Sequence, residues 1–334
     1  MKVSVITVCR NAESTIAKTI EGILSQTYPQ IEYLIIDGTS TDHTLDIIER
    51  HRQKGSDRLT TVISEPDDGI YQAMNKGIRH ATGDWLYFAN ADDYLFDENV
   101  IQDLVEFVQQ HPDSDLIYGD HEARFTNGGS NIYQPVACDR LLEEMICLGD
   151  DRIHQPASFF RASLFSDKGL YFNESYRIAA DYEWFLKVLQ APQFTIHYYP
   201  RTVVSYAHGG ASGDFESLFH EVFEIQRQDA LCSSPEWLSK RLERMQELYV
   251  YKSTRLERSH SLAIARLRQI KELTPIAARV PGLEEQIRLL TADYESQLST
   301  LNTRIAAMES SKFWQLRSQW FTLKRKLGLP TDDG

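Results

Sequence analysis

The chain has 334 residues, of which 42% are hydrophobic and 11% aromatic, so it is long and apolar enough to bury more than one average domain core. Its net charge of -13 argues against nucleic acid as a general partner, because phosphate binding needs a basic surface and residues 1–230 hold no basic cluster. No apolar run has the length of a membrane-spanning helix, no signal peptide precedes the first strand-like run, and the four cysteines are too scattered for a metal or redox motif, so we expect a cytoplasmic protein.

The first 90 residues alternate between short β-branched or aromatic runs and helical patterns. Four runs are interpreted as strands, at residues 3–8, 31–36, 59–63 and 85–89. Between the first two, Ile16, Ile20 and Ile23 recur at helical spacing. This alternation predicts an α/β fold with a doubly wound, mostly parallel sheet. In such a sheet ligands bind at the carboxyl ends of the strands, where this chain carries polar residues.

The fourth run ends in the sequence Asn-Ala-Asp-Asp at residues 90–93. A strand that ends there brings the carboxylates of Asp92 and Asp93 to one rim of the sheet. Hard cations such as Mg²⁺ and Mn²⁺ take oxygen ligands and are usually held by one or two carboxylates together with substrate phosphates. The pair therefore predicts a metal site, with a solvated turn as the alternative because Asp is common in turns.

Four ordered blocks in this half of the chain resemble the family-two inverting glycosyltransferases with the GT-A fold. They are SVITVCRN at 4–11, SQTYP at 25–29, IDGTSTD at 36–42 and SEPDDGIYQAMNKG at 64–77. The resemblance covers roughly residues 1–230. It implies a nucleotide-binding half at 1–120 and a half at 121–230 that holds the acceptor and the catalytic base.

The resemblance assigns nucleotide and metal contacts by position. Asp37 would bind the nucleotide base, accepting the imide N–H of uracil or thymine, whereas a helix cap fits Ser40 or Asp42 better. Asp92 would lie near the ribose and the metal, and Asp93 would bind the Mn²⁺ or Mg²⁺ ion. Further nucleotide-binding residues are expected at Thr7, Cys9, Asn11, Glu13, Gly38, Ser40, Asp67 and Asn75.

Two of the first-loop positions are ambiguous. Glu13 fits first-turn helix chemistry equally well, because carboxylates are favoured at helix N-termini. Arg10 stands where many members of the family have an aromatic residue that stacks on the base. A guanidinium can stack too, but this departure leaves the identity of the nucleotide open.

The catalytic base is expected in the block YRIAADYEWFLK at residues 176–187. The family commonly has Glu-Asp there, and this chain has Ala180-Asp181. We assign Asp181 as the base, which takes the proton of an acceptor hydroxyl while the anomeric carbon is attacked from the face opposite the diphosphate. Attack from that face inverts the anomeric configuration. The alternative for Asp181 is an N-cap of the helix that follows.

Other site residues are expected nearby. The acceptor side is predicted to include His154, Gln155, Tyr182 and Trp184. A histidine in an aromatic segment such as that of His154 is more often a core residue. His208, in the HGGAS sequence at 208–212, is a candidate ligand of the metal or diphosphate, with a simple glycine-rich turn as the alternative.

After residue 233 glycine nearly disappears and a helical extension at 233–334 is expected. Apolar residues recur at spacings of three and four over 283–308, which predicts a helix that pairs with another helix. Its partner is either the catalytic domain or a second copy of the chain, and we prefer the homo-oligomer. Pro275 and Pro281 predict two or three helices instead of one rod.

The tail at 310–329 has five basic residues, no acidic residue and an aromatic helical face. A basic amphipathic helix of this kind favours the surface of an anionic membrane, each basic residue contributing about 1 kcal/mol. We therefore expect peripheral binding at the inner face of the cell membrane. Docking of the aromatic face on the protein's own core is the alternative.

Together these features predict a metal-dependent inverting glycosyltransferase. It would move a single sugar from a UDP- or dTDP-linked donor to a hydroxyl acceptor, in surface polysaccharide or glycolipid assembly. A nucleotidyltransferase is the nearest competing enzyme, but a glycine-rich, basic signature would be expected where this chain has Cys-Arg-Asn-Ala-Glu at 9–13. An inactive sugar-nucleotide-binding or scaffolding subunit is the other alternative, and the presence of Asp92, Asp93 and Asp181 argues against it.

Overall fold

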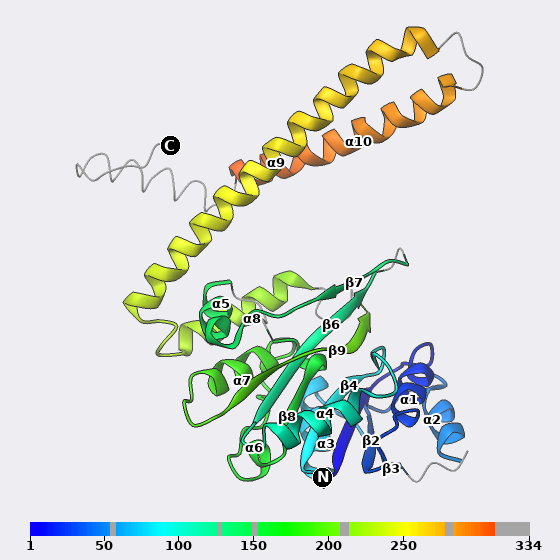
Figure 1. Cartoon of the computed structure of the whole chain (residues 1–334), viewed down its shortest axis with the longest axis vertical. Helices are drawn as coiled ribbons and strands as arrows, with labels where there is room; N and C mark the ends of the chain where they lie inside the picture. The colour runs from blue at the N-terminus through cyan, green and yellow to red at the C-terminus, as the bar shows by residue number, and fades with distance from the viewer. Residues whose placement is uncertain (54–57, 126–127, 149–152, 208–213, 278–282, 311–334) are drawn as a thin grey trace. The chain divides into compact units, whose positions relative to one another are not determined.

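The computed structural model describes residues 1–53, 58–125, 128–148, 153–207, 214–277 and 283–310 (Figure 1). Two compact units divide the chain, Met1–Arg241 and Leu242–Gly334. The predicted metal ligand His208 lies outside the described residues, as do Pro281 and residues 311–329 of the predicted membrane-binding tail.

Four parallel strands form the first part of the sheet in the order β3-β2-β1-β4 (Figure 1). Their bounds are Val3–Cys9 for β1, Ile31–Asp37 for β2, Leu59–Ser64 for β3 and Trp85–Asn90 for β4. Each begins at the predicted residue and runs one residue further at its carboxyl end. Every residue of β1 and β2 is buried, as expected for parallel strands that are covered on both faces.

The helices of this half cover opposite faces of the sheet. They are α1 Ile16–Leu24, α2 Thr44–Gln53, α3 Ile70–His80 and α4 Val100–Gln110. Buried residues of α3 pack with Ile6 and Ile36 in one core cluster, whereas those of α1, α2 and α4 pack with Val5 and Ile35 in the other. Successive residues of a strand thus point to opposite faces of the sheet. The apolar runs of the sequence provide hydrophobic side chains for both faces.

The second part of the sheet mixes strand directions. It continues from β4 as β8-β6-β9-β5, with β7 paired to β6. Only β6 and β9 are parallel here, and β8, β5 and β7 pair antiparallel with their neighbours. These strands span Tyr94–Leu95 for β5, Leu116–Arg124 for β6, Ser130–Tyr133 for β7, Ser158–Arg161 for β8 and Ile196–Ala207 for β9. The predicted α/β fold is confirmed, with a mixed sheet whose parallel part carries the first four loops.

Short helices complete the first unit. They are the 3₁₀ turns η1 Cys138–Arg140 and η2 Gln155–Ala157, and the α-helices α5 Leu141–Leu148, α6 Ser163–Ser166, α7 Ala180–Leu189 and α8 Phe215–Gln228. Buried residues of α5, α7 and α8 join the same core cluster as α3. That packing sets α7 and α8 beside α3 on one face of the sheet.

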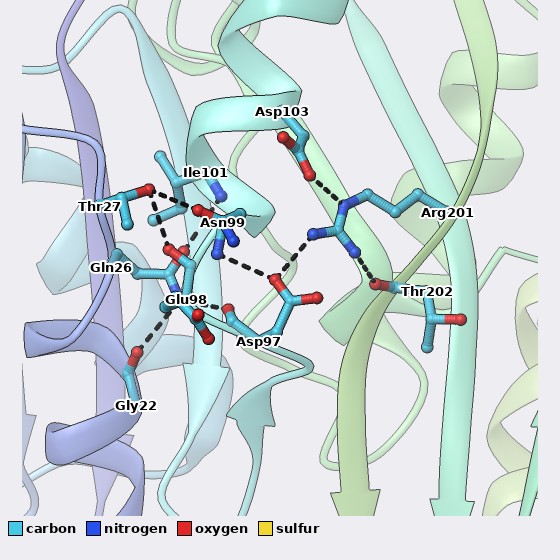
Figure 2. Close-up of polar contacts among 10 residues, drawn as sticks. All are labelled: Gly22, Gln26, Thr27, Asp97, Glu98, Asn99, Ile101, Asp103, Arg201 and Thr202. Atoms are coloured by element: carbon cyan, nitrogen blue, oxygen red, sulfur yellow. Dashed lines mark hydrogen bonds and ion pairs between the residues drawn. The ribbon is translucent and has the colours of Figure 1, made fainter.

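A polar network holds the segment that follows residues 90–93 (Figure 2). Gln26, in the SQTYP block, donates through Nε2 to the backbone carbonyl of Asp97 at 2.7 Å. Arg201 of β9 donates to the carboxylates of Asp97 and Asp103, each at 2.7 Å. These contacts join the residue after α1, the segment after β5 and β9, so they fix the segment that follows the predicted metal ligands.

The C-terminal extension forms a pair of helices in the described residues, α9 Pro235–Ala277 and α10 Leu283–Ser310. Within it Arg266 of α9 donates to the hydroxyl of Tyr294 of α10 at 2.7 Å, and both helices line a shared groove. Part of the predicted apolar stripe, Tyr294 and Leu301, therefore lies against a helix of the same chain. Pairing with a second copy stays a prediction. Among the helices that the structure describes, none combines the length and apolar character needed to span a bilayer.

Candidate active site

A cleft of about 230 Å³ opens at the carboxyl end of β4. It collects side chains from α3, β4, the segment before η2, the start of α7 and the end of β9. The polar residues that line it are Tyr71, Asn90, Asp92, Asp93, His154, Gln155, Arg177, Asp181 and Tyr206. Five of the residues predicted from sequence, Asp92, Asp93, His154, Gln155 and Asp181, thus meet around one cavity.

Asp93 is a nearly buried carboxylate, with 3% of its surface exposed. Its Oδ2 accepts from Asn90 Nδ2 at 3.0 Å, and its Oδ1 accepts from the backbone N–H of Ala207 at 3.3 Å. Burial, followed by the charge of Asp92, raises the pKa of Asp93 to about 7. A buried carboxylate beside a second one is stabilised by a bound cation, which offsets the burial cost and the repulsion.

The oxygen atoms around Asp93 suit a hard cation. Asn90 Oδ1 is buried without a hydrogen-bond partner in the described structure, next to the carboxylates of Asp92 and Asp93. Within the described ranges no three His, Cys, Asp or Glu side chains form a cage for a metal ion. Mg²⁺ and Mn²⁺ typically take one or two protein carboxylates and complete their shell with substrate phosphates. The residues present therefore fit such an ion.

Arg124, which sequence reasoning missed, fastens the Asp92–Asp93 turn to β9. Its Nη2 donates to the backbone carbonyl of Asp92 at 2.7 Å, and its Nη1 donates to Ser205 Oγ at 2.8 Å. Its guanidinium also lies 4.0 Å from the ring centroid of Tyr94. No local motif marks Arg124, because its role depends on how β6 and β9 pair.

Asp181 lies in the first turn of α7 and does not cap it. The N-cap is Ala179, which makes no side-chain capping bond. Asp181 Oδ1 accepts from the Tyr71 hydroxyl at 2.8 Å and from the backbone N–H of Tyr182 at 2.9 Å. Burial raises the pKa of Asp181, and the Tyr71 hydrogen bond only partly opposes it. A carboxylate of raised pKa in a cleft is suited to accept a proton.

A second group of predicted residues gathers at the ends of β1, β2 and β3. Asp37 is fully buried and accepts from the backbone N–H of Ser40 at 3.0 Å, from Ser64 Oγ at 2.6 Å and from Cys9 Sγ at 3.7 Å. Burial, with the charge of Asp37, raises the pKa of the Cys9 thiol. A Cβ on Gly38 would lie 2.4 Å from Asp67 Oδ2, so glycine lets that carboxylate approach.

The first two loops are bonded to each other. Asn11 Oδ1 accepts from the backbone N–H of Thr41 at 2.8 Å, and Glu13 Oε2 accepts from that of His43 at 2.9 Å. Asn11 and Thr39 are the non-glycine residues with positive φ in the described structure, at 52° and 55°. Asn11 and Glu13 therefore hold together the loops that follow β1 and β2, which form a polar rim at this edge of the sheet. Residues with strained backbone, such as Asn11 and Thr39, often cluster at ligand sites.

Four predicted site residues lie in the core instead, with at most 2% of their surface exposed. Thr7 bonds to the Tyr33 hydroxyl at 3.0 Å, and the Asn75 amide bonds to the backbone of Phe172. Tyr182 donates to the carbonyl of Met145, and Trp184 donates to that of Leu170. In this structure their side chains serve packing, and their expected nucleotide and acceptor contacts stay predictions, because a motif places a residue in an element without fixing the face on which its side chain lies.

His154 is both a packed aromatic residue and part of the cleft wall. Its ring stacks on His121 with centroids 4.4 Å apart and lies 4.5 Å from that of Tyr206. Burial lowers the pKa of His154 to about 3 and that of His121 to about 4. Both imidazoles are thus neutral at physiological pH, and this side of the cleft presents uncharged rings opposite its carboxylates.

Comparison with known proteins matches residues 4–165 to the family model described as glycosyl transferase family 2. A PGL/p-HBAD biosynthesis glycosyltransferase of Mycobacterium tuberculosis strain H37Ra is 35% identical over 211 residues, which is 62% of this chain and 77% of that protein. The putative glycosyltransferase EpsE of Bacillus subtilis is 36% identical over 110 residues, 33% of this chain and 39% of EpsE.

Two solved structures share the fold. Staphylococcus aureus TarS 1–349 in complex with UDP-GlcNAc is similar with a TM-score of 0.56 and 20% identity, covering 92% of each chain. Mannosyltransferase PcManGT from Pyrobaculum calidifontis, in complex with GDP-Man and Mn²⁺, is similar with a TM-score of 0.54 and 18% identity over 94% of this chain and 87% of that one. At these identities the likeness shows the fold alone.

Proposed function

The chain belongs to glycosyl transferase family 2 and is a glycosyltransferase, and from this premise we propose a metal-dependent, inverting transfer of a single sugar from a UDP- or dTDP-linked donor to a hydroxyl acceptor. The observation that carries the proposal is the meeting of Asp93 and Asp181 around one cleft. One carboxylate is suited to a cation and the other to a proton, which are the two charges that the reaction must handle.

The metal site is assigned to Asp92 and Asp93, with Asn90 Oδ1 as a further oxygen. These residues would hold a divalent ion, which when bound would neutralise the charge that develops on the leaving nucleoside diphosphate. Asn90 and the backbone of Ala207 orient the Asp93 carboxylate, and Arg124 fixes the turn from the other side. The Mn²⁺ in the PcManGT complex supports a divalent metal in this fold.

The base is assigned to Asp181. Its carboxylate takes the proton of the acceptor hydroxyl as that oxygen bonds to the anomeric carbon and the bond to the diphosphate breaks. Attack from the face opposite the diphosphate inverts the anomeric centre. Tyr71 orients Asp181 through its hydroxyl, and burial makes the carboxylate more basic than an exposed one.

The nucleotide is placed on the rim formed by Cys9, Asn11, Asp37, Gly38 and Asp67. The TarS complexes with UDP and UDP-GlcNAc support a uridine donor, whereas the GDP-Man of PcManGT makes guanosine the competing choice. In the present structure Asp37 bonds to Ser40, Ser64 and Cys9. A base that bonds to Asp37 would exchange with one of these contacts.

The acceptor is placed on the side of His154, Gln155 and Tyr206. One relative is named for PGL/p-HBAD biosynthesis, and TarS is named as a poly(ribitol-phosphate) β-N-acetylglucosaminyltransferase. These names support an acceptor in glycolipid or surface polymer assembly. We further propose that the enzyme acts in the cytoplasm at the inner face of the membrane, held there by residues 310–329, and that the helical extension can pair with a second copy.

A thermal-shift panel tests the donor site. The purified protein is measured with UDP, dTDP, GDP, CMP and ADP, each with and without Mn²⁺, because selective binding raises the melting temperature. We expect a metal-dependent shift with UDP or dTDP. A shift with GDP alone would keep the enzyme and remove the uracil or thymine assignment, and no shift with any nucleotide would favour the scaffolding alternative.

A further inference from the structure

A carboxylate from α8 holds the segment that leads into α7. Glu221 Oε1 accepts from the backbone N–H of Arg177 at 2.9 Å. Its Oε2 accepts from those of Ile178 and Ala179, both at 2.9 Å. One side chain thus bonds to three consecutive backbone amides directly before the helix that carries Asp181.

These bonds satisfy the amides of the turn that leads into α7, of which that of Ala179 belongs to the start of the helix. Its N-cap Ala179 has no side-chain acceptor, and buried amides at a helix start need partners. A capping residue normally supplies one acceptor from within the same segment. Here the acceptor comes from a different helix, so the start of α7 is tied to the position of α8.

Tyr71 of α3 holds the same segment from another element. Its hydroxyl lies 2.6 Å from the backbone carbonyl of Ile178 and 2.8 Å from Asp181 Oδ1. The turn at 177–179 is therefore bonded by Glu221 through its amides, and Tyr71 shares its single hydroxyl hydrogen between the carbonyl of this turn and Asp181. Any rotation of this turn would displace Asp181, which follows Ala179 by two residues.

From this geometry we propose that Glu221 is the positioning residue of the catalytic base, fixing the turn at 177–179 so that Asp181 faces the acceptor hydroxyl. The role rests on the proposed assignment of Asp181. Glu221 does not line the cleft, so it acts through the backbone and touches no substrate. A displacement of about 1 Å at a reacting group can cost about 100-fold in rate, which is the scale on which such a residue acts.

The charge of Glu221 gives the proposal a second readout. It adds to burial in raising the pKa of Asp181, while the Tyr71 hydroxyl lowers it. Besides Tyr71, the other charged or titratable side chains that line the cleft are Arg177 before α7, Asp92 and Asp93 after β4, His154 before η2 and Tyr206 of β9. The pH profiles are measured at saturating divalent metal, so that metal occupancy does not change with pH and the acid limb of the rate reports the base.

The test compares Glu221→Gln with Glu221→Asp. Glutamine has one acceptor oxygen, so it loses at least one amide bond and removes the charge. We expect kcat to fall by about 10- to 100-fold with unchanged metal-dependent UDP binding and donor KM. The acid limb of kcat/KM moves to lower pH, because Asp181 without its negative neighbour protonates only in more acidic solution. Glu221→Asp keeps the negative charge, but its shorter side chain cannot reach all three amides. We therefore expect kcat to fall while the acid limb of kcat/KM stays near that of the wild type.

Glu224→Gln is the matched control on the same helix, where Glu224 is partly exposed and pairs with Arg227 at 2.7 Å. It should leave kcat and the pH limb unchanged. Hydrogen exchange supplies a direct check, since the amides of residues 177–179 should exchange faster in Glu221→Gln than in this control.

Three results would overturn the proposal. One is an unchanged kcat and pH limb in Glu221→Gln. Another is a loss of UDP binding or folding that matches the loss of rate, which would make Glu221 a general structural residue. Third, normal exchange at 177–179 with reduced kcat would exclude a positioning role. Asp181→Asn measured alongside separates the two claims, since near-normal transfer in that variant would reject Asp181 as the base and with it the proposed mechanism.

Discussion

The two polar rims at the carboxyl ends of the strands use their side chains in opposite ways. On the nucleotide rim Asn11, Glu13 and Asp37 bond to the chain itself, mainly to amides and hydroxyls of the neighbouring loops. Around the cleft, Asp93 keeps a raised pKa and Asn90 Oδ1 keeps no partner in the described structure. The self-bonded groups of the first rim form a frame, and a nucleotide bound there would exchange with some of their contacts, whereas the polar groups around the cleft are left for a ligand to complete.

This difference separates stability from function. Substitutions in the frame should weaken the fold, because they leave buried polar groups unbonded. Substitutions in the cleft should remove binding or transfer and spare or even raise stability, because that cleft holds destabilising charge. Each prediction below tests one side of this contrast.

The largest effect is expected from Asp181→Asn. The amide cannot accept the hydroxyl proton, so transfer should fall by at least about 100-fold, the lower end of what a positioned base supplies. Metal-dependent binding of UDP should stay that of the wild type, as measured by titration calorimetry. Transfer close to normal would place the base on another residue.

Asp93→Asn should abolish the dependence of nucleotide binding on Mn²⁺. The variant loses the buried charge that a cation would neutralise, while its shape is kept. Calorimetry of UDP with and without Mn²⁺ is the measurement, and Asp84→Asn, which alters an exposed residue before β4, is the control. Wild-type metal dependence in Asp93→Asn would reject this carboxylate as the ligand.

Asp93 also predicts a dependence of stability on pH in the absence of metal. Its pKa rises from 3.8 to about 7 on folding, so between these values the folded state binds more protons than the unfolded state. The contribution of this group to the unfolding free energy therefore decreases as pH rises from about 4 to about 7. Asp93→Asn should melt higher than the wild type at pH 8 and show no such gain at pH 4. Equal differences at both values would contradict the raised pKa.

The smallest effect is expected from a substitution among the self-bonded residues of the first rim. Thr44 is fully buried and its Oγ1 accepts from the backbone N–H of Ala12 at 2.7 Å. Thr44→Val leaves that amide unbonded and should cost about 1–3 kcal/mol of unfolding free energy. Transfer measured below the melting temperature should change little. Thr61→Val in β3, at a partly exposed position, is the matched control.

Sequence patterns predicted the strands well because β1, β2 and β4 are buried on both faces and are therefore rich in apolar residues, and because the edge strand β3 still carries β-branched residues. The family resemblance assigned Asp92, Asp93 and Asp181 to one site, and the structure has them line one cleft, because the first two follow β4 and the third begins α7 at the same edge of the sheet. The expected site roles of Thr7 and Trp184 stay predictions, because these residues share a segment with the residues of the cleft while their side chains lie in the core.

The sequence alone could not predict residues whose role depends on a contact between two elements that are distant in the chain. Glu221 and Arg124 carry no local motif, and their roles come from the packing of α8 against α7 and from the pairing of β6 with β9. Tyr71 stood inside a quoted block, yet only the position of α3 beside the start of α7 gives its hydroxyl a partner in Asp181. Such contacts depend on tertiary geometry, which neither periodicity nor spacing encodes.

The most direct test of the central claim is an anomalous difference map from crystals grown with UDP and Mn²⁺. The claim is that the cleft at the end of β4, and not the self-bonded rim, is where the divalent ion binds. We predict a manganese peak between the Asp93 carboxylate and the diphosphate. UDP bound without a peak there, or with its peak on the rim of Asp37 and Asp67, would contradict the account.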